Sequence, residues 1–523
     1  MTFTDLLLSC GITFEVFEKA VDTGILILLI GTITYALIAR LITHPLASVP
    51  GPRLAALTSW YEFYYDVLLG GKYVQRIETL HNECHSPIVR TGPNQVHVND
   101  PQVYKRVFGV ASNYIKSPFF YTSAGLPEAI GGIIDRKAHH VRRSILGPRF
   151  APKVIASYEP GLVKLVRKCT DIMARKAKTT QSKGIAMPRY TRALTVDVIS
   201  EFTFGRTMGL VNEEDEMPEL LVDLSMFTAQ FHIVKHFPIY RRMLSSMPDA
   251  ISKKFMPGFF QFRERAKDSV DALIAEKDAG LRKNHHPDSG TVLDLLLTRN
   301  PKKNHEIPGP TALVDEGCAF IVGGSDTTGH TMESATYLVL SNKEILQTLR
   351  KELDNASPYI KDDFDLSRVL QLPFLSAVIK ESLRLFTPVP SPLPRTVPDG
   401  GITVDGHFLP EGTILTHSLY LIHHNPKLFA SPKTFNPFRW LGESGKQLEQ
   451  YYVPFSKGSR SCIGIDLAYH EMYTFLATLF SRFDMEVVNT GKEDMEWADY
   501  MFAKRKGEVR VRITRDRWGG DLV

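Results

Sequence analysis

The sequence feature that most constrains the fold is a cysteine between spaced glycines, just before a long apolar-periodic stretch. The segment from Phe455 to Gly464 reads FSKGSRSCIG and contains Cys462. Residues 465–488 have helical periodicity, so we expect Cys462 to stand just before the N-terminus of a helix. Unpaired backbone N–H groups and the positive end of the helix dipole stabilise a thiolate at such a place. Cys462 is therefore a candidate metal ligand.

The neighbours of Cys462 have the properties that a haem group would require. Gly458 permits a turn, and Gly464 lets the backbone lie against a flat macrocycle that a Cβ would push away. Arg460 offers a forked cation to a porphyrin carboxylate, and Phe455 offers an apolar wall beside the sulfur. The alternative for a lone cysteine is a small buried apolar residue, but four partners at fixed spacing favour the ligand.

This stretch resembles the haem-binding loop of the cytochrome P450 superfamily, the haem-thiolate monooxygenases, whose pattern is F-x-x-G-x-R-x-C-x-G. Every fixed position of the pattern is present. The resemblance spans nearly the whole chain. It implies haem as the cofactor with Cys462 as its axial thiolate, and a mainly α fold with small β-sheets.

The composition argues against several other classes of protein. The 523 residues carry a formal charge of +5, which is too small and too evenly spread for nucleic-acid binding. The five cysteines are far apart and form no C-x-x-C pair, which argues against zinc ribbons, iron–sulfur clusters and a secreted disulfide framework. With 43% hydrophobic residues and no internal repeat, one large domain with an anchor is a plausible organisation.

An uncharged apolar segment near the N-terminus, residues 23–39, predicts a membrane span. Extended over about residues 21–42, it reaches most of the way across a hydrocarbon core of ~30 Å. A cleaved signal peptide is disfavoured because acidic residues precede the segment, and a buried core helix is the other alternative. Arg40, Arg53 and Lys72 follow it, so the positive-inside rule keeps the bulk of the chain in the cytosol.

These features divide the chain into a membrane anchor (1–44), a proline-rich hinge (45–52) and a catalytic domain (53–523). Within the hinge, Val49-Pro-Gly-Pro52 breaks any helix and resembles the hinge of microsomal P450s. We therefore expect a single-pass protein of the endoplasmic reticulum membrane with a cytosolic catalytic domain. The sequon at Asn355 would then lie on the cytosolic side and stay unmodified.

A helix predicted over about residues 312–340 holds a second motif, GGSDTTG, at residues 323–329. Glycines inside a helix each cost roughly 1 kcal/mol relative to alanine. Something other than helix stability therefore accounts for the three glycines in this motif. A locally broken rule in an otherwise consistent helix points to function.

The cleavage of O2 gives the residues of this motif a role. Gly323 and Gly324 would leave room beside the helix for a diatomic on the iron. Asp326 and Thr327 would supply its protons, and the Thr327 hydroxyl can bond back to the Gly323 carbonyl. The stretch resembles the P450 motif (A/G)-G-x-(D/E)-T-T at each position. Mid-helix packing is the alternative.

Three more residues are candidates for holding the haem carboxylates. His139 and Arg143 lie four apart on a basic helix predicted over residues 135–146, and so share a face. P450s often have Trp-x-x-x-Arg at this point, with His139 here replacing Trp. Arg395, in an extended proline-rich segment, resembles the other carboxylate clamp of the family. A solvated basic face is the alternative for the helix.

Glu381 and Arg384 lie three apart on a helix predicted over residues 374–386. A buried acid and base must be paired, and the resemblance implies that Arg439 completes a structural, non-catalytic trio. P450s usually have Glu before this arginine, whereas Phe438 stands here, so the geometry of the third partner stays open. An ordinary surface ion pair is the alternative.

Further patterns predict smaller elements and the walls of a substrate pocket. A hairpin is expected within residues 87–99, strands within 401–408 and 507–513, and a helix starting at the capping-box spacing Ser341–Glu344. By the family pattern, residues 119–132 and 501–502 reach the substrate, with simple packing as the alternative for the loop aromatics. The Phe-, Met- and Ile-rich segment 220–243 is consistent with a lid over an apolar pocket, although core packing explains it equally well, and residues 389–392 are candidates for lining the pocket.

The resemblance implies a membrane-anchored monooxygenase that inserts one atom of O2 into an apolar small molecule. Electrons would come from NADPH through a separate flavoprotein reductase, because the chain contains no P-loop or dinucleotide-binding stretch. The arrangement of loops and helices in this sequence resembles that of fungal P450s of secondary metabolism, and this resemblance implies a terpenoid or polyketide substrate. The alternatives are a haem-thiolate isomerase or dehydratase that uses no O2, and a non-catalytic haem sensor or electron carrier. The acid–alcohol pair argues against both.

Overall fold

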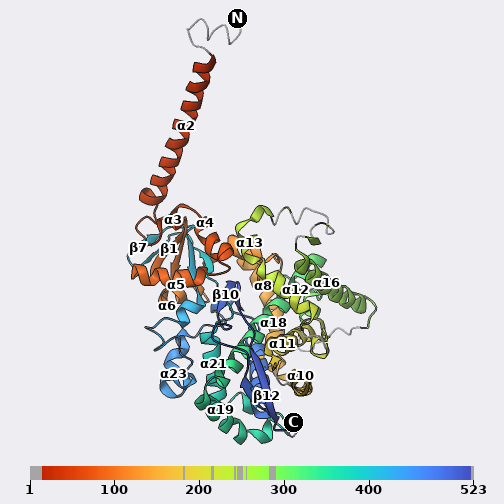
Figure 1. Cartoon of the computed structure of the whole chain (residues 1–523). Helices are drawn as coiled ribbons and strands as arrows, with labels where there is room; N and C mark the ends of the chain where they lie inside the picture. The colour runs from red at the N-terminus through yellow and green to blue at the C-terminus, as the bar shows by residue number, and fades with distance from the viewer. Residues whose placement is uncertain are drawn as a thin grey trace.

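A helical body, a sheet-rich edge and one N-terminal helix that stands clear of both make up the chain (Figure 1). This computed structural model describes residues 14–180, 183–213, 217–240, 243, 251, 253–254, 256–281 and 290–519. The start of the predicted anchor, including Cys10, lies outside the described residues, as do Arg241 and Arg242 of the segment 220–243.

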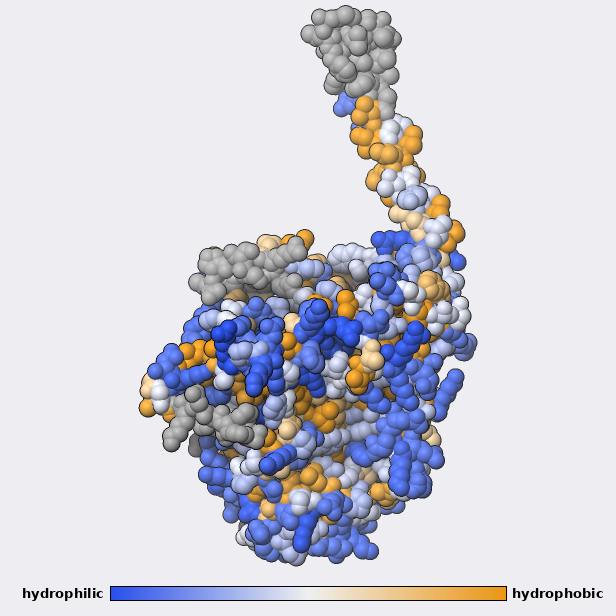
Figure 2. Space-filling view, turned by 180° about the vertical axis from the view of Figure 1, so that it is seen from behind, coloured by the Kyte–Doolittle hydropathy of each residue, from blue (hydrophilic) through white to orange (hydrophobic). Residues whose placement is uncertain are grey.

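The N-terminal helix α2 (Phe14–Ile38) continues into a π-helical turn, η1 (Ala39–Thr43). Its apolar stretch Val21–Thr43 is long and apolar enough to cross a membrane, and none of it is buried against the rest of the chain. Apolar side chains cover it on the face seen in Figure 2. The alternative of a buried core helix is therefore wrong.

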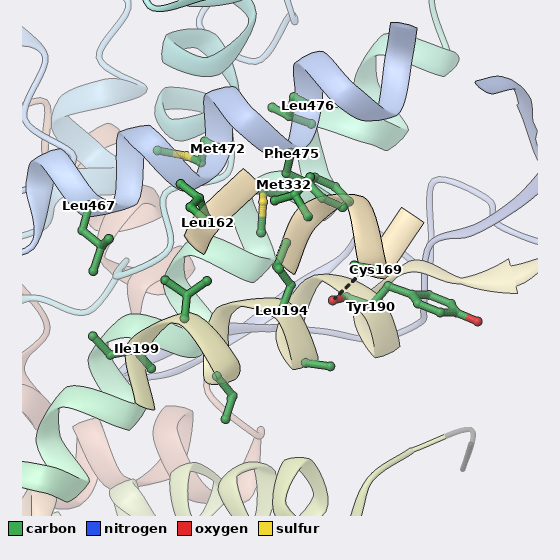
Figure 3. Close-up of a cluster of buried hydrophobic side chains, with 14 of the residues drawn as sticks. Leu162, Cys169, Tyr190, Leu194, Ile199, Met332, Leu467, Met472, Phe475 and Leu476 are labelled. Atoms are coloured by element: carbon green, nitrogen blue, oxygen red, sulfur yellow. Dashed lines mark hydrogen bonds between the residues drawn. The ribbon is translucent and has the colours of Figure 1, made fainter. Parts of the chain in front are cut away.

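The helical body is built around α18 (Pro310–Leu340), which packs against α11 (Met187–Phe204), α16 (Pro257–Asp278), α21 (Pro373–Leu385) and α24 (Ile465–Arg482). The main apolar core joins α11, α18 and α24 to α10 (Glu159–Thr179). Figure 3 shows Leu194, Met332 and Phe475 close together there, and also the Cys169 thiol, which donates to the Tyr190 carbonyl at 3.8 Å.

Two helices predicted from sequence patterns have the expected bounds within a few residues, namely α18 and α21. The basic helix α8 (Arg136–Leu146) is also present, and the Asp135 side chain caps it by accepting from the Ala138 N–H at 2.7 Å. The predicted capping box at Ser341 is wrong, because Asn342 caps α19 (Lys343–Asn355) by accepting from the Ile345 N–H.

The predicted helix over residues 465–488 is too long. After α24 ends at Arg482, the chain continues as strand β9 (Phe483–Val487), which pairs with β12 (Arg510–Asp516). Phe483 and Met485 are buried and the residue between them is not, a period of two that marks a strand. The sequence of this segment, Phe-Asp-Met-Glu-Val, alternates apolar and acidic residues, so the change of period is visible in the sequence and the predicted helix overran it.

Small sheets form the edge of the molecule. The largest has the order β1 (Ile88–Gly92), β2 (Gln95–Val98), β8 (Ile414–His417), β5 (Leu393–Thr396) and β3 (Ile115–Lys116). Its β1–β2 hairpin confirms the prediction for residues 87–99. The other sheets are β4 (Ile185–Ala186) with β12 and β9, β6 (Ile402–Val404) with β7 (His407–Leu409), and β10 (Trp497–Tyr500) with β11 (Phe502–Arg505).

The remaining described helices connect these parts. The α-helices are α3 (Arg53–Leu57), α4 (Trp60–Phe63), α5 (Tyr73–Cys84), α6 (Pro101–Phe108), α7 (Pro118–Tyr121), α9 (Pro152–Ser157), α12 (Glu219–Ala229), α13 (Phe231–His236), α17 (Val292–Leu296), α20 (Leu366–Val369), α22 (Leu419–His423) and α23 (Gly442–Leu448). The shorter turns are η2 (Tyr64–Leu68), η3 (Thr122–Ala124), η4 (Gly147–Phe150), η5 (Leu210–Asn212), η6 (Pro301–Lys303), η7 (Ser357–Tyr359), η8 (Pro437–Trp440), η9 (Glu449–Tyr451) and η10 (Gly458–Arg460).

His417, at the end of β8, gives the fold a dependence on pH. Its ring is fully buried, with centroids 5.5 Å from that of Tyr104 and 5.7 Å from that of Phe108. Burial lowers the pKa of His417 from 6.5 to about 3. The folded pKa is the lower one, so the stabilisation is complete above pH 6.5 and is lost as the pH falls toward 3.

The substitution His417→Phe keeps an aromatic ring in place and removes the titrating group. When the pH is lowered from 7.5 to 5, the unfolding free energy of the wild type should fall by about 2 kcal/mol more than that of the variant. Urea unfolding of the full-length protein in detergent at the two pH values measures this. His140→Phe, at an exposed position of α8, should keep the wild-type loss. An equal loss in His417→Phe would contradict the prediction.

Candidate active site

A cavity of ≈ 1790 Å³ lies inside the helical body, bounded by α18, the Cys462 loop and the start of α24. It is larger than the roughly 300–1,000 Å³ of an ordinary ligand pocket, so it has room for more than one small molecule. Each of the four segments predicted to surround a substrate contributes to its wall, through residues such as Phe120, Phe231, Val389 and Met501.

Cys462 lies in the loop between η10 and α24 and contributes to the cavity wall. Its backbone N–H donates to the Phe455 carbonyl at 2.9 Å, which closes the loop. The side chain is exposed although protein surrounds it, because its free surface faces the cavity.

Burial disfavours the charged form of the Cys462 side chain in the protein alone. Burial raises the pKa of the thiol, and the Gly464 N–H and the Arg143 guanidinium oppose this only in part. The helix terminus alone therefore does not hold a thiolate here. A metal cation bound to the sulfur would supply the remaining stabilisation.

The two glycines of the Cys462 loop serve different needs. Gly458 has a φ of +72°, and a Cβ there would lie 2.1 Å from the Phe108 carbonyl oxygen, so this turn requires glycine. A Cβ on Gly464 would meet only the Phe150 ring at 3.9 Å. Gly464 therefore presents bare backbone to the cavity. Phe455 also contributes to the wall and packs on Tyr469 with a ring separation of 5.3 Å.

Basic side chains gather behind one side of the cavity. Burial and the nearby Arg395 lower the pKa of Arg460 to about 10. Burial, Arg460 and Lys116 lower the pKa of His139 to about 3, so this imidazole is neutral at neutral pH. These four side chains, Arg460, Arg395, His139 and Lys116, are therefore close enough to affect one another's pKa. Of the four, Arg460 and Lys116 line the cavity.

Among the residues that the structure describes, the cations in this group form no ion pair. Arg460 donates to the carbonyls of Ile133 and Ile134 at 2.5 and 2.8 Å, and Lys116 donates to a loop carbonyl. The buried Nε of Arg395 has no hydrogen-bond partner. Within the described ranges, no carboxylate lies within ion-pair distance of Arg460, Lys116 or Arg395. Buried cations without anions favour a site that receives an anionic group.

The spacing of His139 and Arg143 predicts that both hold one haem carboxylate. In the protein alone, Arg143 bonds to the loop that carries Cys462. Its guanidinium donates to the Ser461 carbonyl at 2.7 Å and lies 3.4 Å from the Ser461 hydroxyl. Ser461 directly precedes Cys462, so Arg143 ties helix α8 to the cysteine loop. His139 itself is buried.

Gly323 and Thr327 form an open stretch in the middle of α18. A Cβ on Gly323 would meet no atom within 4 Å, and the residue is exposed to the cavity although the helix is otherwise largely buried. The Thr327 hydroxyl donates to the Gly323 carbonyl at 2.7 Å, which confirms the predicted back-bond. The Thr327 side chain also reaches the cavity wall.

Gly324 has a different reason to be glycine from the predicted one. A Cβ at this position would lie 2.6 Å from the side chain of Ile199 on α11. Both glycines line the cavity, but Gly324 also permits the close approach of α11 and α18, whereas Gly323 has only open space beside it.

Asp326 points away from the open stretch that Thr327 faces. Its carboxylate accepts from the Arg192 guanidinium at 2.7 Å and does not line the cavity. Arg192, on α11, also donates to the Ser225 hydroxyl at 3.1 Å. Asp326 is thus held by an ion pair between two core helices.

Glu381, Arg384 and Arg439 form a buried network. Arg384 donates twice to the Glu381 carboxylate at 2.8 Å, and Arg439 donates to it at 3.0 Å. The Trp440 indole N–H donates to the same carboxylate at 2.8 Å. Phe438, the departure from the family pattern, instead packs against Phe374 with a ring separation of 5.1 Å. Arg439 therefore reaches its partner despite this change.

Sequence reasoning missed Lys116, Arg192 and Trp440. Each lies far along the chain from the group it serves, or outside the recognised motifs. The one available signal was at Trp440, which adjoins Arg439. Nothing in the local pattern around Lys116 or Arg192 indicates a role in the site.

The family model "Cytochrome P450" matches residues 58–512 of the chain. The chain belongs to the cytochrome P450 family. Among its relatives, cytochrome P450 monooxygenase penB of Penicillium thymicola is 61% identical over 442 residues, covering 84% of this chain and 99% of penB. Cytochrome P450 monooxygenase asqL of Emericella nidulans is 61% identical over 428 residues, covering 82% of this chain and 88% of asqL.

Solved structures agree on the fold of this P450. A cytochrome P450 named CYP102L1 matches with a TM-score of 0.71 at 20% identity, covering 89% of this chain and 98% of that one. The haem domain of cytochrome P450DA matches with a TM-score of 0.70 at 16% identity, covering 90% and 98%. At these identities the likeness concerns the fold alone.

This P450 is a haem-thiolate monooxygenase. The site fits the haem group on three observations. The cavity contains a cysteine sulfur, the backbone at Gly464 is bare toward it, and three cations beside the cysteine loop, Arg460, Lys116 and Arg395, form no ion pair among the described residues. A flat dianionic macrocycle with a central metal cation meets all three requirements.

The two adjacent glycines of α18 should respond in opposite ways to alanine. Gly324→Ala forces a Cβ against Ile199, and we expect a loss of about 1–3 kcal/mol of unfolding free energy. Gly323→Ala meets no atom and should gain up to about 1 kcal/mol from helix propensity. Urea unfolding of the two variants measures the difference. If Gly323→Ala lost more unfolding free energy than Gly324→Ala, the assignment of Gly324 to the helix contact and of Gly323 to the open space would be contradicted.

Proposed function

We propose that this P450 is a microsomal monooxygenase in which Cys462 provides the axial thiolate and an apolar small molecule is oxidised in the cavity. The observation that carries the proposal is one cavity reached by three features. These are the Cys462 sulfur, the Arg460 side chain, and the open stretch of α18 at Gly323 and Thr327.

The haem would be held by the Cys462 loop and the basic side chains. Arg460, Arg395 and His139 are the residues proposed to bind its carboxylates, with Lys116 as a further cation. Arg143 is proposed to fix the loop through Ser461 while its charge favours the thiolate. Phe455, Gly458 and Gly464 would shape the loop and leave room for the macrocycle. When bound, the haem iron would activate O2 so that one oxygen atom enters the substrate.

Thr327 and Asp326 are proposed to supply protons for this chemistry. The Thr327 hydroxyl donates its hydrogen to the Gly323 carbonyl, so its oxygen lone pairs are free to accept a hydrogen bond from the cavity. Rotation of the hydroxyl would let it donate instead. Asp326 is held by Arg192, so it can deliver a proton to the Thr327 region only after this ion pair opens.

Glu381, Arg384 and Arg439 are proposed to be structural. Their network is buried and lies away from the cavity wall. Removing one member would leave a buried charge without its partner.

The substrate and its surroundings follow from the cavity and the anchor. Aromatic side chains such as Phe120, Phe227, Phe231 and Phe259 contribute to the wall, which suits an apolar terpenoid or polyketide skeleton. Residues 1–44 would anchor the protein in the endoplasmic reticulum membrane, and residues 45–52 would lead to the cytosolic catalytic domain, 53–523. A flavoprotein reductase would deliver electrons from NADPH.

Replacing the proposed iron ligand tests the central assignment. Cys462→Ala should lose the thiolate-type spectrum of the reduced, CO-bound protein together with NADPH-dependent oxidation. Microsomes that contain the full chain, its reductase and a panel of apolar metabolites serve for both measurements. Cys84→Ala, at a half-buried cysteine outside the cavity, should behave as the wild type. Full haem content and activity in Cys462→Ala would overturn the proposal.

Replacing the proposed proton donor tests the distal assignment. Thr327→Ala should lower product formation on the order of 10²-fold, while NADPH consumption continues and peroxide accounts for the electrons. The product, NADPH and peroxide are measured in the same microsomes. Thr348→Ala removes a similar threonine back-bond on the exposed face of α19 and should leave the coupling unchanged. Unchanged coupling in Thr327→Ala would refute the role of its hydroxyl.

A further inference from the structure

A group of buried ionisable side chains lies beside the cavity and has no part in the proposed oxidation. The Lys235 cluster consists of Glu62, Asp66, His232, Lys235, His236 and Asp499. It joins three parts of the chain, namely α4 with η2, helix α13, and strand β10. Figure 1 shows α13 beside α4, near the place where α2 leaves the body.

Lys235 is the centre of the cluster. Its ammonium lies 2.7 Å from a Glu62 oxygen and 2.5 Å from an Asp66 oxygen. Lys235 and Asp66 are only 3% and 1% exposed, so these contacts are made almost without solvent. His236 adds a contact to Asp66 at 3.0 Å. The cluster therefore fixes α13 against the segment that follows the anchor.

Glu62, Asp66 and His236 also have the spacing of metal ligands, since their ligand atoms lie within 4.8 Å of one another. The Lys235 ammonium bonds to both carboxylates and supplies the positive charge that a metal ion would bring. Lys235 therefore occupies the place between the two carboxylates that a metal ion would take.

The cluster extends to the turn between β10 and β11. The His232 Nε2–H donates to the Asp499 carbonyl at 2.5 Å, and the His232 ring lies 5.6 Å from the ring of Tyr500. The Asp499 carboxylate accepts from the Met501 N–H at 2.9 Å and from the Ser391 hydroxyl at 2.5 Å. Helix α13 and this turn are thus directly connected.

Both connected elements form the cavity wall. Phe231 and Val234 of α13 reach the cavity, and so do Tyr500 and Met501 of the turn. Met501 has a φ of +71°, a left-handed conformation that is strained for a residue with a side chain. Such a turn persists only when its surroundings hold it, and the Asp499 carboxylate does so.

Burying the charges of the Lys235 cluster costs desolvation free energy, so its role is better sought in geometry than in stability. Well-packed apolar side chains would stabilise the same contact as well or better. Ion pairs and hydrogen bonds differ from apolar packing because they fix direction and distance. The cluster therefore suits the precise placement of two wall elements that lie far apart in the sequence.

We propose that Lys235, His232 and Asp499 are positioning residues that set the shape of the substrate cavity by holding α13 against the β10–β11 turn. The inference rests on the proposed function of this cavity as the substrate site. It follows that the cluster controls which large ligands fit and leaves the space next to the iron unchanged.

Two azoles that bind haem iron through an imidazole nitrogen test the proposal on the ferric holoenzyme. The small 4-phenylimidazole stays near the iron, whereas the bulky clotrimazole extends toward the outer wall. Spectral titration gives the Kd of each azole, and thermal unfolding gives Tm. We expect His232→Phe to change the Kd of clotrimazole on the order of tenfold, with that of 4-phenylimidazole within about twofold.

A second variant tests the ion pair itself. Lys235→Met combined with Asp66→Asn removes one positive and one negative charge, and leaves Glu62, 9% exposed, without its cation. It should change the clotrimazole Kd in the same selective way. Lys267→Met removes an exposed lysine ion pair on α16 and should change neither Kd. His232→Phe alone still decides the question if the double variant does not fold, because it leaves no buried charge unpaired.

The outcomes separate this inference from the function on which it rests. A lower Tm with an unchanged ratio of the two Kd values would show a purely structural cluster and overturn the inference. Equal weakening of both azoles would do the same, because the effect would then reach the iron. Failure of the wild-type protein to bind either azole would instead contradict the proposed function of the cavity.

Discussion

The packing of α18 against α11 is the constraint on which the rest of the structure depends. At Gly324 the two helices are so close that a Cβ would collide with Ile199, whereas at Gly323 there is no neighbouring atom. Protein interiors are close-packed, so an open face inside a core is unusual. The cavity next to Gly323 is thus a consequence of holding one face of α18 tightly while the other is left bare. Thr327 and the Cys462 loop are placed with respect to this helix.

Electrostatics explains why the site requires a partner. Burial raises the pKa of Cys462, and Arg460, Lys116 and Arg395 form no ion pair within the described part of the chain. Both conditions are unfavourable in the protein alone. A metal cation at the sulfur and carboxylates at the basic group would relieve them together. The arrangement is therefore complementary to haem in charge as well as in shape.

The sequence was sufficient for the features that depend on local spacing. It predicted α18, the Thr327 back-bond and the Glu381–Arg384 pair, since each involves residues within one helix. It did not predict the partner of Asp326 or the reason for Gly324, because both depend on α11, over a hundred residues away. The strand after Arg482 was missed for a different reason: its alternation of apolar and acidic residues is local and visible, but it directly follows a long helical pattern with no glycine or proline between them.

The division between the two glycines has a consequence for how such an enzyme diversifies. Mutations that reach the cavity from the Gly323 side, or from the β10–β11 turn, alter the chamber without disturbing the helix contact at Gly324. A side chain added at Gly323 meets open space, whereas one added at Gly324, less than a third of a turn further round the helix, collides with α11. The same helix is thus open to substitution at one residue and closed to it at the next.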